Sequence, residues 1–282
     1  MATPVVTLLS DFGERDTFVG QMKGIVLSYC ADATLVDLTH LIPAQSIFSG
    51  ALHLGAAWRS FPPRAIHLAV VDPGVGSERR PLAVSFGNHT FVLPDNGLIS
   101  GVLGGESPER VIELAIPKDA NRVISRTFHG RDIFAPAAGQ LAAGLDIGSL
   151  GEEVHPDSIV RLEIPTSRVD GDSVVGEILF IDHFGNAITN ITRADVSRFA
   201  GSGGAVACGW FRAGQISSRY QDVEPASPVA LVSSMDTLEL AVREGSASSR
   251  YSLQAGMIVT VHGPGITSPN ESEKPGASSA EG

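Results

Sequence analysis

The chain has 282 residues, of which 43% are hydrophobic and 18% charged, enough for one large domain or two smaller ones with buried cores. Its formal net charge of -11 argues against a duplex nucleic-acid binder, because phosphate contacts need a basic face, and against a surface held to anionic lipid. The 31 glycines and 17 prolines favour many short elements over a few long helices.

The sequence carries no visible targeting, membrane or metal signal. Its first residues lack a basic region followed by a long apolar run, and no uncharged apolar stretch approaches the roughly 20 residues that cross a bilayer. The cysteines Cys30 and Cys208 lie far apart and form no CxxC pair, and the eight histidines show no pair at metal-ligand spacing. We therefore expect a reduced, cytoplasmic protein with neither a membrane span nor a metal.

Strand and helix patterns alternate in the first part of the chain. Short apolar runs at 5–9, 35–38 and 65–71 predict buried strands, and helical patterns at 17–29, with Asp16 as the cap, and at 45–58 separate them. This alternation is typical of an α/β domain. Asp11 and Asp72 follow the first and third strands, where such sheets bind ligands, so we expect the two carboxylates to share a site.

The pattern changes further along the chain. Runs at 82–86 and 90–93 predict a hairpin, a short helix follows Gly97, and a helix is expected over 131–145 with Pro136 in its first turns. After about residue 168 the remaining strand-like runs lie at 174–181, 187–191, 205–208, 229–232 and 258–261. We therefore predict an α/β domain over 1–168, a smaller all-β domain of sandwich or barrel type over 169–262, and a disordered tail over 263–282.

Three clusters could carry chemistry, and each has a simpler structural interpretation. Asp11 could bind a ribose diol, or Asp11 and Asp16 could cap a turn and a helix. Arg79 could fold back towards Asp72 beside a glycine-rich turn, or the pair could be a solvated ion pair worth about 0–1 kcal/mol. His129, just before a glycine at a helix start, could handle a proton or water, or be structural.

Six short motifs resemble one known family when they are taken in order. They are Ser-Asp-Phe-Gly at 10–13, Val-Asp-Leu-Thr-His at 36–40, Val-Asp-Pro-Gly-Val-Gly at 71–76, Pro-Asp-Asn-Gly-Leu at 94–98, Thr-Phe-His-Gly-Arg-Asp at 127–132 and Ile-Asp-His-Phe-Gly-Asn at 181–186. The sequence resembles the S-adenosyl-L-methionine (SAM) hydroxide adenosyltransferases, relatives of the SAM-dependent fluorinase and chlorinase, over residues 5 to about 262.

The resemblance implies a fold, an assembly and a reaction. The fold is an α/β N-terminal domain with a central, mostly parallel sheet flanked by helices, plus a smaller barrel-like all-β C-terminal domain. Family members are homotrimers that bind SAM between neighbouring subunits, and the hydrolytic branch cleaves SAM with water to adenosine and L-methionine. SAM is the substrate, and no cofactor is implied. A SAM-dependent halogenase and a non-catalytic SAM or adenosine binder remain the alternatives.

The resemblance also assigns residues. The triad of the hydrolytic branch falls on Asp72, Arg79 and His129, whereas the halogenating branch has tyrosines at the positions of Asp72 and His129 and a tryptophan near Gln45. Asp11 is placed on the ribose hydroxyls. The other substrate-binding residues that the resemblance implies are Phe128, Gly130, Asp182, Phe184 and Asn186.

Overall fold

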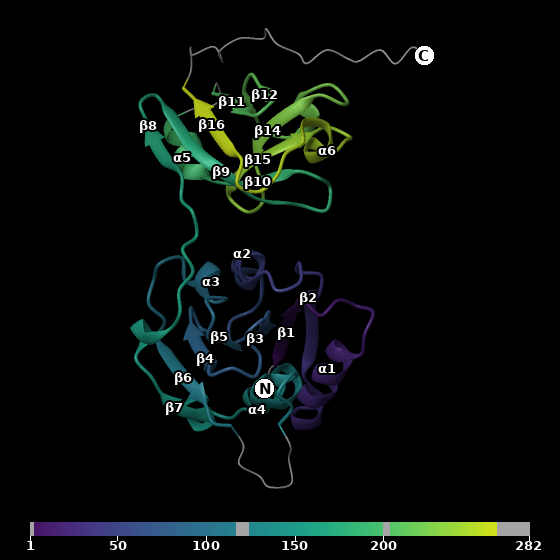
Figure 1. Ribbon diagram of the computed structural model, residues 1–282, viewed down its shortest axis with the longest axis vertical. Coiled ribbons are helices and arrows are strands. Elements are labelled where there is room, and N and C mark those ends of the chain that lie inside the picture. The colour runs from purple at the N-terminus through teal and green to yellow at the C-terminus, as the bar shows by residue number, and fades with distance from the viewer. Residues whose placement is uncertain (1–2, 117–123, 200–203, 264–282) are drawn as a thin grey trace. The chain divides into compact units, whose positions relative to one another are not determined.

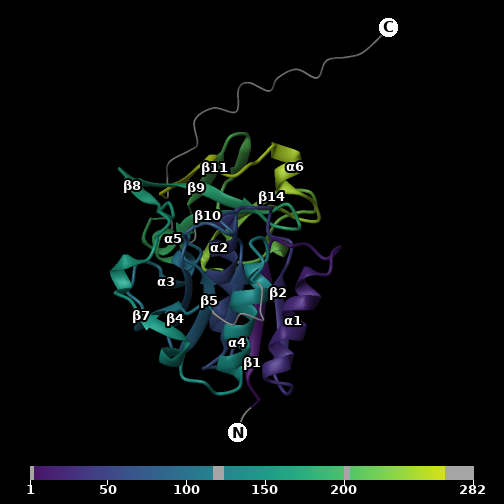
Figure 2. The same cartoon turned by 60° about the horizontal axis from the view of Figure 1, so that its bottom comes forward.

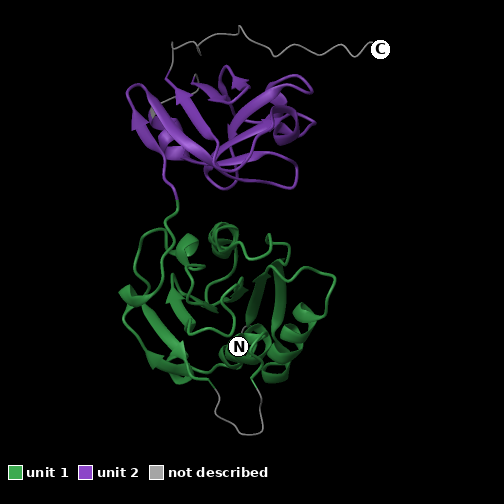
Figure 3. Cartoon of the chain, viewed as in Figure 1, with its two compact units in different colours: residues 1–164 green, residues 165–282 purple. Residues whose placement is uncertain are grey.

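The computed structural model describes residues 3–116, 124–199 and 204–263. The chain divides into two compact units, Met1–Ile164 and Pro165–Gly282, here called the N-terminal and C-terminal units (Figure 3). This division lies shortly before the domain boundary predicted near residue 168. The tail predicted as disordered lies outside the described residues except for Gly263.

The N-terminal unit is built on a seven-stranded sheet with the order β2-β1-β3-β5-β4-β6-β7. Its strands are β1 (Val5–Ser10), β2 (Thr34–Thr39), β3 (Ile66–Val70), β4 (Pro81–Phe86), β5 (His89–Pro94), β6 (Arg110–Leu114) and β7 (Gly151–Glu153). β1 pairs in parallel with β2 and β3, and β3 with β5. The pairs β4–β5, β4–β6 and β6–β7 are antiparallel.

The expectation of a mostly parallel sheet is therefore wrong, because the sheet is mixed. The predicted hairpin is the reason. β4 and β5 are joined by a two-residue turn at Gly87 and Asn88, whose φ angles of 59° and 61° suit a tight hairpin turn. Once the chain reverses there, β4 and the two strands beyond it continue as antiparallel neighbours.

Helices cover both faces of this sheet. They are α1 (Phe18–Tyr29), α2 (Ile47–Ala57), α3 (Ser100–Leu103) and α4 (Ala135–Ala142). α1 and α4 pack against each other and share a core with Val6 and Leu8 of β1, whereas α2 and α3 share a core with Leu9 (Figures 1 and 2). Because successive side chains of a strand point to opposite faces, the buried run of β1 supplies both cores.

The start of α1 differs from expectation, and the helix expected after residue 130 has an unusual first turn. Thr17, not Asp16, occupies the N-cap of α1, and no side chain caps this helix, so the predicted Asp16 cap is wrong. The helix expected over 131–145 starts at Gly130 as a π-helical turn, Gly130–Phe134, which runs directly into α4 and ends at Ala142. Pro136 lies in the first turn of α4, as predicted.

The C-terminal unit is a barrel-like β domain, as predicted. Its strands are β8 (Arg168–Asp170), β9 (Ser173–Ile181), β10 (Ala187–Thr192), β11 (Ala205–Cys208), β12 (Phe211–Ala213), β13 (Ile216–Ser217), β14 (Pro228–Val232), β15 (Thr237–Val242) and β16 (Ile258–His262), with helices α5 (Arg193–Phe199) and α6 (Ala247–Tyr251). They form one sheet in the order β12-β11-β16-β9-β10-β15-β14-β13, with β8 paired to β9. β12 also packs against β14, which brings distant positions of that order together. Within the described ranges no helix is long and apolar enough to cross a membrane.

Candidate active site

Two loops bring Asp72, Arg79 and His129 together at one end of the N-terminal sheet. Asp72 follows β3, and Asp11 follows β1, its parallel neighbour, in which Ser10 is opposite Val70. Because the carboxyl ends of parallel strands meet at one edge, the loop that carries Asp72 and the loop that carries Asp11 start from the same edge of the sheet. His129 comes from elsewhere, at the N-cap of the π-helical turn before α4. Such turns often occur at functional sites.

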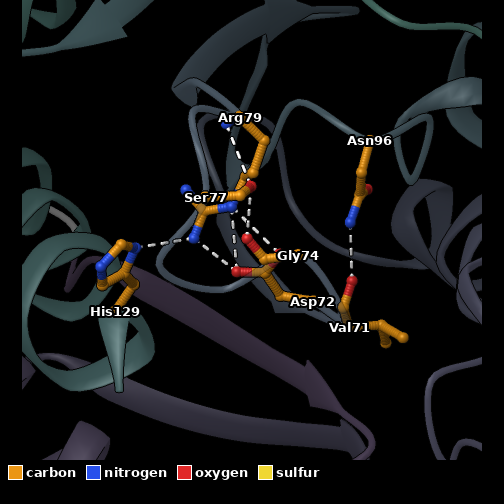
Figure 4. Close-up of polar contacts among 7 residues, drawn as sticks. All are labelled: Val71, Asp72, Gly74, Ser77, Arg79, Asn96 and His129. Carbon is orange, nitrogen blue, oxygen red and sulfur yellow. Dashed lines mark hydrogen bonds and ion pairs between the residues drawn. The ribbon is translucent and has the colours of Figure 1, made fainter. Parts of the chain in front are cut away.

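Arg79 lies between the other two side chains (Figure 4). Its Nε donates to both carboxylate oxygens of Asp72 at 3.0 Å, and its Nη2 contacts Oδ2 of Asp72 and Nδ1 of His129, the latter at 2.8 Å. The side chains of Asp72 and Arg79 are only 4% and 9% exposed. This is therefore a buried, hydrogen-bonded ion pair, and the solvated surface pair considered from the sequence is wrong.

The contact with Arg79 fixes the protonation of His129. A guanidinium has only donors, so Nδ1 of His129 must accept, and a neutral ring then carries its proton on Nε2. Burial lowers the pKa of His129, and the neighbouring charge of Arg79 lowers it further, against the opposing effect of Asp72 and Asp132. His129 is thus neutral near pH 7 and offers Nε2–H as a donor.

One guanidinium nitrogen of Arg79, Nη1, makes no hydrogen bond to another described residue, whereas Nε and Nη2 are engaged with Asp72 and His129. The ring of Phe134 packs against the guanidinium, with 5.1 Å between Cζ and the ring centroid. The network therefore combines two available donors, Nη1 of Arg79 and Nε2 of His129, with the carboxylate of Asp72. Such a set can hold a water molecule or a hydroxide ion by its oxygen.

Gly76 lies where the loop that carries Asp72 and Arg79 packs against the segment that leads to His129. Its φ is +79°, and an added Cβ would lie 2.5 Å from the carbonyl oxygen of Arg126, in the segment that leads to His129. The loop of Asp72 and Arg79 therefore passes directly against that segment, and only glycine fits.

We expect Gly76→Ala to separate the two loops. The variant should lose roughly 2–3 kcal/mol of folding free energy, from the strained φ and the clash together, and at least tenfold in turnover. Gly104→Ala is the matched control, because Gly104 has a φ of +54° but no atom within 4 Å of the added Cβ. Thermal unfolding and turnover, measured for both variants, check this; equal effects of the two would show that strain alone matters.

The comparison with known proteins identifies the family. Models of the SAM hydroxide adenosyltransferase N-terminal and C-terminal domains match residues 6–151 and 176–260. The chain belongs to the SAM hydroxide adenosyltransferase family. The resemblance drawn from the six motifs is confirmed.

Individual relatives agree with that family. A (R)-S-adenosyl-L-methionine hydrolase of Thermus thermophilus is 38% identical over 261 residues, which cover 90% of this chain and 98% of the relative. A fluorinase of Nocardia brasiliensis is 28% identical and covers 92% of this chain and 96% of its own. The crystal structure of an uncharacterized conserved protein from Thermotoga maritima superposes with a TM-score of 0.85 at 28% identity, over 91% of this chain and 99% of that one.

Two further predicted substrate residues pack inside the N-terminal unit. Phe128 is 8% exposed, and its ring meets those of Phe12 and Phe18 edge-on at 5.8 and 5.1 Å. An added Cβ at Gly130 would lie 3.1 Å from the sulfur of Met22. Both residues therefore hold the His129 segment against α1, and their contact with a substrate stays a prediction.

Asp182, Phe184 and Asn186 form one tight turn of the C-terminal unit between β9 and β10. Oδ1 of Asp182 accepts from the backbone amides of Phe184 and Asn186 at 2.9 and 2.8 Å, and Oδ2 accepts from Nδ2 of Asn186 at 3.1 Å. These hydrogen bonds hold the segment in a compact turn. Phe184 is 73% exposed, and its ring meets that of His183 edge-on at 5.5 Å between centroids, so one ring face remains accessible. The roles of the three residues towards a substrate stay predictions.

Sequence reasoning assigned no role to Asn96, which supports the loop of the triad. Its Nδ2 donates to the carbonyl of Val71 at 2.9 Å, directly before Asp72 (Figure 4). The motif at 94–98 contains this asparagine, so the motif was the available signal. In the described ranges, no group of three or more His, Cys, Asp or Glu side chains has the arrangement of a metal site.

Proposed function

We propose that the protein hydrolyses SAM by attack of water or hydroxide on C5′ of the ribose, giving adenosine and L-methionine. The observation that carries the proposal is the buried Asp72–Arg79–His129 network, with 2.8 Å between Nη2 of Arg79 and Nδ1 of His129. It contains the three side chains that the resemblance assigns to the hydrolytic branch. The name of the Thermus thermophilus relative, (R)-S-adenosyl-L-methionine hydrolase, supports the same reaction.

In the proposed mechanism, the attacking oxygen is held by the Nη1 donors of Arg79 and by Nε2–H of His129. Both groups donate, so they stabilise hydroxide character on that oxygen, and Asp72 completes its hydrogen bonds. The oxygen bonds to C5′, the C5′–S bond breaks, and its electron pair stays on sulfur as the neutral thioether of methionine. When water is the nucleophile, the proton it loses passes to the solvent, because Arg79 and the Nε2–H of His129 are donors and cannot accept it; when hydroxide attacks, no proton is lost. In-line alignment of the attacking oxygen, C5′ and the sulfur lowers the activation barrier further.

The remaining parts of the proposal concern the substrate and the assembly. Asp11 binds the ribose hydroxyls, and Asp182, Phe184 and Asn186 meet the methionine or adenine end. The sulfonium is already a good leaving group, so the proposed reaction uses no resident cofactor. We include the homotrimer of the family in the proposal, with the N-terminal unit of one subunit and the C-terminal unit of its neighbour sharing the site. Analytical ultracentrifugation tests that assembly.

Product analysis tests the reaction. The protein is incubated for hours with each sulfonium epimer of SAM, with and without chloride, and the nucleoside is identified by chromatography and mass. We expect adenosine and methionine, faster from the (R) epimer that the relative's name specifies. A 5′-chloro-nucleoside would instead support a halogenase, and bound but intact SAM a non-catalytic binding protein. Asp72 and His129, where the halogenating branch is expected to carry tyrosines, oppose the first of these outcomes.

A further inference from the structure

A second polar network lies at the end of β1, next to the residues used above. Lys23 Nζ donates to Oδ2 of Asp37 at 2.6 Å, Oδ1 of Asp37 contacts Nε2 of His40 at 3.1 Å, and Nδ1 of His40 contacts Oγ of Ser10 at 2.7 Å. Ser10 and His40 are 0% and 4% exposed. The proposed reaction uses none of these four side chains.

The chemistry of the groups gives the network a direction. Partial burial works to raise the pKa of Asp37, but hydrogen bonds from Lys23 and His40 outweigh it and hold that pKa below its usual value. The ionised carboxylate only accepts, so Nε2 of His40 donates; in the tautomer with its single proton on Nε2, Nδ1 accepts from the hydroxyl of Ser10. Ser10 Oγ also accepts from the backbone amide of Phe12 at 3.3 Å. The orientation of each group is thus set by the next.

The network ends on the segment that carries Asp11. The backbone amide of Gly13 donates to the carbonyl of His40 at 2.8 Å, and the amide of Gln45 donates to Oδ2 of Asp11 at 2.8 Å. Residues 10–13 are therefore tied to the segment 40–45 on both sides of Asp11. Ser10 itself is not a candidate nucleophile, because it is fully buried and its oxygen is engaged in both directions.

We propose that Ser10, His40, Asp37 and Lys23 are positioning residues that fix the Asp11 carboxylate for the substrate's ribose diol. The inference rests on the proposed function, because it takes Asp11 as the ribose-binding group. The network then controls affinity for the adenosine half of the substrate and leaves the Asp72–Arg79–His129 chemistry unchanged.

A double-mutant cycle with Ser10→Ala and Asp11→Ala tests the inference. Dissociation constants for adenosine are measured by calorimetry, and KM and kcat for SAM by product formation. Loss of one oriented hydrogen bond should weaken adenosine binding about five- to tenfold and raise KM similarly, with kcat changed less than about threefold. In the Asp11→Ala background, Ser10→Ala should have no further effect, because it acts through Asp11.

Two further variants control for folding. Ser100→Ala removes another buried hydroxyl of the N-terminal unit, which accepts from the amide of Leu162 at 2.8 Å, and should leave adenosine affinity unchanged. Asp37→Ala cuts the network at a side chain that is 41% exposed, so it opens little buried space, and it should weaken adenosine binding in the direction of Ser10→Ala.

The outcomes separate the two proposals. Additive effects of Ser10→Ala and Asp11→Ala, a fall in kcat at unchanged KM, or equal effects of Ser10→Ala and Ser100→Ala would overturn the positioning role. Unchanged adenosine affinity in Asp11→Ala would instead overturn the ribose role of Asp11, whatever Ser10→Ala does. Weakened binding in Asp11→Ala together with normal binding in Ser10→Ala would refute the inference alone.

Discussion

An Asp72→Asn variant is expected to lose about 10²–10⁴ in kcat while its dissociation constant for SAM changes less than about threefold. The asparagine keeps the shape of the side chain and still accepts one bond from Nε of Arg79, but it lacks the charge. Arg79 is 9% exposed, so its buried guanidinium would lose its counter-charge. It would then reorient relative to Nδ1 of His129. The groups that we place on the substrate are elsewhere, so binding survives while the attacking oxygen loses its alignment.

The neighbouring pair Arg80–Asp95 offers a matched control for this variant. Nε and Nη2 of Arg80 donate to Oδ2 of Asp95 at 2.9 and 2.6 Å, and Asp95 is 8% exposed. Asp95→Asn therefore removes a comparable buried charge from an adjacent ion pair without touching the triad. Both variants should lose comparable stability, on the order of 1–3 kcal/mol, in chemical denaturation.

Only Asp72→Asn should lose turnover in single-turnover assays with saturating SAM. Full turnover in Asp72→Asn, or an equal loss in Asp95→Asn, would contradict the role of Asp72. The first result would remove the carboxylate from the proposed mechanism. The second would show that loss of any buried charge in this region is enough to disturb the site.

Local patterns predicted β1 to β5, five of the seven strands of the N-terminal sheet, whereas β6 and β7 were not predicted. Val5–Ser10 and Ile66–Val70 are short, β-branched and buried, and such runs have few other interpretations. Asp11 and Asp72 were expected at one edge because that follows from strand order alone. The sequence allowed Arg79 to fold back towards Asp72 beside a glycine-rich turn, and the structure confirms the contact.

Features that depend on distant partners were not predictable in the same way. β15 (Thr237–Val242) was not predicted as a strand, and it carries the buried Glu239. A carboxylate is unfavourable in a buried strand unless it has a hydrogen-bond donor. Here Oη of Tyr220, 19 residues away, donates to Oε1 of Glu239 at 2.6 Å. The hydrogen bond between His40 and Ser10 spans 30 positions, and the local sequence around neither residue predicts it. Its only signal was the presence of both residues in family motifs.

A buried histidine of the N-terminal unit should make the protein unstable in acid. His67 of β3 is 0% exposed, its Nδ1 contacts Oγ1 of Thr7 at 2.8 Å, and its Nε2 contacts Nδ1 of His89 at 3.0 Å. Its ring stacks on Phe91 with 4.7 Å between centroids. Burial, with a smaller contribution from His89, lowers the pKa of His67 from 6.5 to about 3. The native state therefore keeps this ring neutral.

The direction of the pH effect follows from proton binding. Below pH 6.5 the unfolded chain binds a proton at His67 that the native state refuses until the pH approaches 3. The free energy of unfolding is therefore unaffected by this group above pH 6.5. It falls by about 1.4 kcal/mol per pH unit as the pH drops from 6.5 towards 3. Burial also lowers the pKa of His89, which adds to the loss in the same direction.

His67→Gln isolates this contribution, because the amide can donate and accept but does not titrate. The variant should be less stable than the natural chain at pH 7, since glutamine fits the stacked site poorly. The difference in the free energy of unfolding should then shrink by about 2 kcal/mol between pH 7 and pH 5, as the natural chain loses stability that the variant never had. His155→Gln, at a side chain that is 75% exposed, should follow the natural chain over the same range. A constant difference between His67→Gln and the natural chain would mean that His67 accepts its proton in the folded state, and the acid sensitivity would then have to originate elsewhere.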